Sequence, residues 1–106
     1  MRLHRLLSRW RQQVPRDGVD LDDVLGVMRH LKMDVQARSS GHLLATHRAL
    51  IGSMEFPQGG VTINCHAFGK QGRVHPSAIR DLLKAATIIE QAAENERSGS
   101  DEAVPG

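Results

Sequence analysis

The chain has 106 residues, of which 40% are hydrophobic and 25% charged, and its formal net charge at pH 7 is +2. This composition excludes a disordered chain, and no apolar run approaches the roughly 20 residues of a membrane-spanning helix. Cys65 is the single cysteine, which excludes an intramolecular disulfide, and the start shows no secretory leader. We therefore expect one domain in a reducing cytoplasm, without a membrane partner.

Residues 1–16 predict an amphipathic basic helix. The segment contains five arginines and no acid. Its apolar residues recur at helical spacing: Leu3, Leu6, Leu7, Trp10 and Val14. One interpretation is an arm that binds anionic RNA or an anionic membrane surface. The favoured interpretation is an extra helix docked on the domain or on a partner chain, because such stripes usually face a core.

A second helix and a hairpin are predicted next. Asp20 is a candidate N-cap, and an apolar stripe follows it, so a helix is expected over roughly residues 20–32. Apolar and polar residues then alternate over 33–38 and again over 42–48. Because a Ser-Ser-Gly turn separates these two runs, we expect them to pair as antiparallel strands.

The remaining half predicts one strand and one long helix. After a glycine- and proline-containing loop at 49–60, alternation over 61–66 indicates a third strand, and 67–74 is expected to be a second loop. Pro76 suits the first position of a helix, which is expected over roughly residues 76–90. The acidic segment 91–106 is expected to be a frayed, solvated tail.

The predicted class is α+β: a helix, a three-stranded antiparallel sheet and a helix, preceded by the extra N-terminal helix. Both helices of the helix–sheet–helix unit can cover one face of the sheet. The other face would then be exposed to solvent. We expect function on that exposed face or at its rim.

Three segments carry a family resemblance. Residues 74–86, with the sequence VHPSAIRDLLKAA, resemble the proline-started final helix of the HicA toxins. Residues 38–42, RSSGH, fall where that family has a Gly-Ser-His turn, with the glycine and serine in inverted order. Residues 61–66, VTINCH, are similar to its third strand. The resemblance covers about residues 20–88, and the extensions outside it leave homo-oligomerisation open.

HicA proteins are small ribonucleases of type II toxin–antitoxin systems, and a HicB antitoxin holds them inactive. The resemblance therefore implies a fold like that of the double-stranded-RNA-binding domain. It also implies mRNA as the substrate and a HicB-like antitoxin as the partner. On the same basis, His42 takes the place of the catalytic histidine.

The chemistry of RNA cleavage agrees with such a role for a histidine. The reaction needs a base for the 2′-hydroxyl, positive charge for the phosphorane and an acid for the leaving oxygen, and imidazole can serve both proton steps near neutral pH. His42 is the candidate general base, and His47 and His66 are candidates for the acid. Candidate phosphate contacts are four cations: Lys70, Arg73, Arg80 and Lys84. The scheme requires no metal or cofactor.

Two alternatives are weighed against the nuclease. The first is a catalytically inactive RNA-binding or protein-interaction module of the same fold. With three aromatic residues and no tyrosine, base stacking would contribute little, so contacts to the RNA backbone and 2′-hydroxyls are expected. The second is a zinc site built from histidines and Cys65, which is disfavoured because no recognised ligand spacing occurs. His75 is expected to cap or flank the last helix.

Overall fold

The computed structural model describes residues 2–38, 41–64 and 73–103. Two of the candidate site residues, His66 and Lys70, lie outside these ranges. The predicted α+β class, with its extra N-terminal helix, is confirmed. The elements in chain order are α1 (Arg2–Gln12), β1 (Val19–Asp20), α2 (Leu21–His30), β2 (Asp34–Ala37), β3 (His42–Thr46), the short 3₁₀ helix η2 (Arg48–Leu50), β4 (Gly60–Asn64), β5 (Arg73–Val74) and α3 (Pro76–Ala103).

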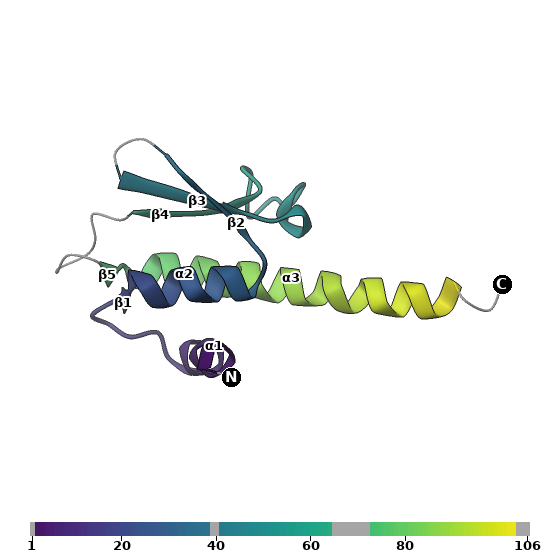
Figure 1. Cartoon of the computed structure of the whole chain (residues 1–106), viewed down its shortest axis with the longest axis horizontal. Coiled ribbons are helices and arrows are strands. Elements are labelled where there is room, and N and C mark those ends of the chain that lie inside the picture. Colours follow the sequence, from purple (N-terminus) through teal and green to yellow (C-terminus); the bar gives the residue numbers. More distant parts are fainter. Residues whose placement is uncertain (1, 39–40, 65–72, 104–106) are drawn as a thin grey trace.

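The elements form three layers (Figure 1). Strands β2, β3 and β4 make an antiparallel sheet in that order. Helices α2 and α3 both lie beneath one face of this sheet, where α2 contacts β2 and α3 contacts β4, and α1 lies on the far side of both helices. The helix–hairpin–strand–helix order predicted from the sequence is therefore the observed one.

The two faces of the sheet differ in composition. On β3 and β4, Ala45, Val61 and Ile63 are at most 2% exposed and belong to the core beneath the sheet. Their chain neighbours point the opposite way, because side chains alternate along a strand. The outer face therefore carries mostly polar residues: Asp34, Gln36, His42, Leu44, Thr46, Thr62 and Asn64.

A second, two-stranded sheet was not predicted. Strand β1 pairs with β5, with Val19 opposite Val74 and Asp20 opposite Arg73. The expected loop at 67–74 thus ends in a short strand. Two-residue strands carry no periodicity, so only the approach of distant segments creates them. Because β1 leads into α2 and β5 lies just before α3, this pairing brings the starts of both helices together.

Helix α2 ends in a tight turn that redirects the chain into β2. Its last carbonyls accept two turn bonds, from Lys32 N to Arg29 O at 2.9 Å and from Met33 N to Met28 O at 3.0 Å. Lys32 adopts φ +61, the left-handed conformation that usually carries glycine at this position. At the start of the helix, Asp20 occupies the N-cap position as predicted, but its side chain makes no capping hydrogen bond.

Helix α3 is longer than the sequence predicts, and it ends at Ala103 rather than near Glu90. The expectation of a frayed tail over 91–106 is therefore wrong for residues 91–103, which are helical; residues 104–106 lie outside the described ranges. The segment 91–97, QAAENER, consists largely of good helix formers, and no proline occurs between Pro76 and Pro105. Intrinsic helix propensity therefore predicts the structure of residues 91–97 better than their net acidity does.

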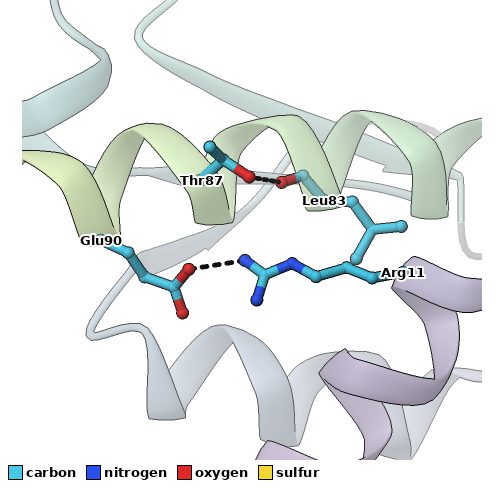
Figure 2. A network of polar contacts seen from close by, with 4 residues as sticks. All are labelled: Arg11, Leu83, Thr87 and Glu90. Carbon is cyan, nitrogen blue, oxygen red and sulfur yellow. Dashed lines mark hydrogen bonds and ion pairs between the residues drawn. The ribbon is translucent and has the colours of Figure 1, made fainter.

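The N-terminal helix docks on the body of the domain. Leu7 and Trp10 of α1 are 1% and 2% exposed, which places them in the common core. Figure 2 shows the polar link beside them, in which Arg11 Nη2 donates to Glu90 Oε1 of α3 at 2.6 Å. Thr87 Oγ1, on the same stretch of α3, donates to Leu83 O at 3.1 Å. The burial of Leu7 and Trp10 and the bond from Arg11 to Glu90 favour the docked helix over a free basic arm.

Candidate functional site

The candidate site is a row of three residues across the turn end of the sheet. His42 lies opposite Asn64 of β4 in the antiparallel register. On the other side, the pairing of β2 with β3 continues past Ala37, and the Arg38 backbone N–H donates to the His42 carbonyl at 2.7 Å. Directly opposed residues share a face, with Cβ atoms about 5 Å apart. The side chains of Arg38, His42 and Asn64 therefore leave the backbone on the same, outer face.

The backbone before His42 explains the inverted Ser-Gly order. Gly41 adopts φ +73, a left-handed conformation that residues with a Cβ adopt only at a cost. Glycine therefore stands where the turn needs it, directly before the first residue of β3. His42 itself is half-buried, whereas Arg38 and Asn64 are exposed.

The rest of the outer face is polar and mostly uncharged. Thr62 and Gln36 flank Leu44 in the middle of the sheet, and Thr46 lies near the opposite end. The acid on this face is Asp34, which accepts a hydrogen bond from Gln36 Nε2 at 3.2 Å and pairs in register with Thr46. The negative charge thus lies at the end of the sheet away from His42. Hydroxyl and amide groups of this kind suit contacts to sugar and phosphate.

The structure does not bring His47 to His42. His47 follows the opposite end of β3, and its Nδ1 accepts a hydrogen bond from the Ala49 backbone N–H at 3.0 Å, which caps η2. His75 uses the same device at the start of α3, because its Nδ1 accepts from the Ser77 backbone N–H at 3.0 Å. The predicted capping role of His75 is confirmed. His47 has a structural role of the same kind.

The predicted phosphate contacts are dispersed. Arg73 Nη1 donates to the Gly18 carbonyl at 3.2 Å and lies 3.8 Å from Asp20 Oδ1. Arg73 therefore stabilises the pairing of β1 with β5. Arg80 and Lys84 are exposed on α3, the helix that lies beneath the inner face. The sheet therefore separates these two cations from the outer face on which His42 lies.

Arg38 is the cation that the sequence interpretation missed. The signal was present, because a hairpin with a Ser39-Ser40-Gly41 turn places Arg38 opposite His42. The sequence interpretation places Arg38 in the alternating strand and in the RSSGH segment, and gives it no role in the site. In the part of the chain that the structure describes, no three His, Cys, Asp or Glu side chains gather into a group that could hold a metal ion.

Comparisons with known proteins return no assignment. No family model, curated protein or solved structure matches the chain. Within residues 2–38, 41–64 and 73–103, no helix is both long and apolar enough to cross a membrane. The functional argument therefore rests on the residues of the outer face and on the chemistry they permit.

Proposed function

We propose that the chain is a HicA-like endoribonuclease that cleaves mRNA without a metal ion, with His42 as the general base. The observation that carries this proposal is the row Arg38, His42 and Asn64 on a polar face of the sheet. The resemblance of residues 20–88 to the HicA family supports it independently. A HicB-like antitoxin is the partner that this function calls for.

The proposed reaction uses the neighbouring 2′-hydroxyl as the nucleophile. His42 accepts its proton, and O2′ attacks the adjacent phosphorus. Arg38 and the Asn64 amide donate to the non-bridging oxygens, where negative charge develops. The P–O5′ bond breaks and O5′ receives a proton from an acid, for which His66 is the remaining candidate. The products are a 2′,3′-cyclic phosphate and a 5′-hydroxyl, and no step requires a metal.

A non-catalytic RNA-binding module of the same fold is the second candidate function. Two observations favour it: His47 caps η2 and Arg73 fastens the small sheet, so two predicted site residues have structural roles. Such a module would bind RNA chiefly through its backbone, with an affinity that falls steeply as salt rises. In a gel-shift assay it would retard RNA and leave it uncut over hours.

Expression of the intact chain in bacteria tests the nuclease directly. We expect growth arrest and loss of mRNA, and we expect His42→Ala to abolish both, because no other group in the row can serve as the base. His4→Ala is the matched control, since His4 is an exposed histidine of α1, on the far side of the helices from the sheet. Equal toxicity of His42→Ala and the unmodified chain would refute the catalytic role of His42.

A further inference from the structure

A groove of about 970 Å³ lies at the end of the sheet away from His42. It is bounded by the end of α2, the β3–η2 junction and the middle of α3. Its apolar lining comes from all three sides: Leu31, Ala49, Ile89, Ala92 and Ala93. A volume of this size exceeds what one side chain fills, and it suits a segment of a second chain.

The charges of the groove are divided between its walls. The wall formed by the end of α2, the start of β2 and the β3–η2 junction carries two cations, Lys32 and Arg48, against one acid, Asp34, and also two histidines, His30 and His47. The wall formed by α3 contributes two acids, Glu90 and Glu96. Glu90 is bound to Arg11 of α1, whereas Glu96 pairs with Arg48 across the groove at 2.6 Å. The side chains of Arg48 and Glu96 are 77% and 63% exposed, so their ion pair contributes little to the stability of the fold. The two side chains can therefore exchange partners readily.

We propose that this groove is a self-association surface, which receives residues 89–96 of α3 from a second copy of the chain in antiparallel orientation. The last turns of α3 project beyond the sheet (Figure 1), so they can reach a second molecule. The stripe that lines the groove lies earlier on α3: Ile89, Ala92, Ala93 and Glu96. It is small and acidic, so the stripe of one copy can pack against the apolar lining of the other copy and pair with its cations. A two-fold axis lets each copy provide both the stripe and the groove.

A second observation comes from the segment that follows the groove wall. Among the described residues, the large apolar side chains that remain exposed are Ile51 and Met54, at 74% and 95%. Ile51 comes directly after η2, whose residues Arg48 and Ala49 line the groove, and Met54 follows three residues later. Exposed apolar residues beside an apolar groove are typical of an interface. A second copy seated in the groove would cover this side of the molecule.

Sedimentation velocity on the full chain, over a range of concentrations, tests the proposal. We expect dimers whose dissociation constant rises at least about fivefold between low and high salt, because charges across the interface are screened. Lys32→Glu and Glu96→Lys should each weaken the dimer at least about tenfold by placing like charges together. Arg16→Glu is the matched control, since Arg16 is exposed in the connection after α1 and the same charge change there should leave the dimer intact.

Mixing the two variants separates a real interface from a general loss of stability. An equimolar mixture of Lys32→Glu and Glu96→Lys restores an opposite-charge pair at both symmetry-related positions, so we expect heterodimers at close to the original affinity. Circular dichroism checks that each variant is folded. A chain that stays monomeric at all concentrations would overturn the proposal, as would charge reversals without effect. A monomer would leave the groove to a different partner. RNA cleavage is measured separately, so either proposal can fail alone.

Discussion

The inner and outer faces of the sheet use the same three strands for different purposes. On the inner face, Ala45, Val61 and Ile63 are buried against α2 and α3, and their identity is set by packing. On the outer face, Thr62 and Asn64 of the same strand are exposed. The stability of the fold therefore depends on one face, which leaves the other free to carry chemistry. Substitutions on the two faces should separate stability from activity.

The largest expected effect is on the inner face. Ile63→Ala removes a fully buried side chain from the centre of the core, and we expect a loss of about 3 kcal/mol in the free energy of unfolding. Thr62→Ala, one residue earlier and on the exposed face, should change it by less than about 0.5 kcal/mol. Urea unfolding followed by circular dichroism measures both. Equal losses would contradict the division into two faces.

A smaller effect is expected at the start of β4, where the sheet is closely packed within its own plane. A Cβ on Gly60 would clash with the Ala45 carbonyl oxygen, a backbone atom that cannot move aside without breaking the β3–β4 pairing. We expect Gly60→Ala to cost about 2 kcal/mol. Gly52→Ala has open space and only an unfavourable φ of +86, so it should cost about 1 kcal/mol. The same urea experiment tests whether Gly60→Ala is the costlier change.

The smallest effect on stability is expected at Arg38. Because this side chain is exposed, Arg38→Gln should leave the free energy of unfolding unchanged within about 0.5 kcal/mol. It should nevertheless slow RNA cleavage at least about tenfold, because a charge that stabilises the phosphorane is lost. Arg9→Gln, on the exposed side of α1, is the control that should cleave at the original rate. A fall in stability that matches the fall in rate would assign Arg38 a structural role instead.

Local sequence patterns predicted the framework of the fold. The alternation of apolar and polar residues predicted the strands to within about two residues. The apolar stripes and Pro76 predicted where the helices lie. These signals depend on neighbouring residues alone. The position of His42 at the turn end of the sheet followed from the same local logic. Gly41 also follows a local rule, since its left-handed φ is one that glycine adopts readily.

What could not be predicted depends on distant partners. The pairing of β1 with β5 and the bond from Arg73 to the Gly18 carbonyl join segments that only the folded chain brings together. The prediction for the end of α3 is wrong for another reason. Acidity and the Ser98-Gly99-Ser100 segment indicate a frayed tail, but the helix formers at 91–97 continue α3 through them to Ala103. The position of Arg38 could be predicted, because pairing across the hairpin turn already places it opposite His42.

The most direct test of the central claim is cleavage of an end-labelled RNA by the purified chain in the presence of EDTA. We expect fragments that end in a 2′,3′-cyclic phosphate, and a rate that falls by about 10²- to 10⁴-fold in His42→Ala, which should unfold at the same urea concentration as the unmodified chain. Cleavage at equal rates by the two proteins would contradict the assignment of His42. RNA that is bound but left uncut by the unmodified chain would contradict the nuclease itself.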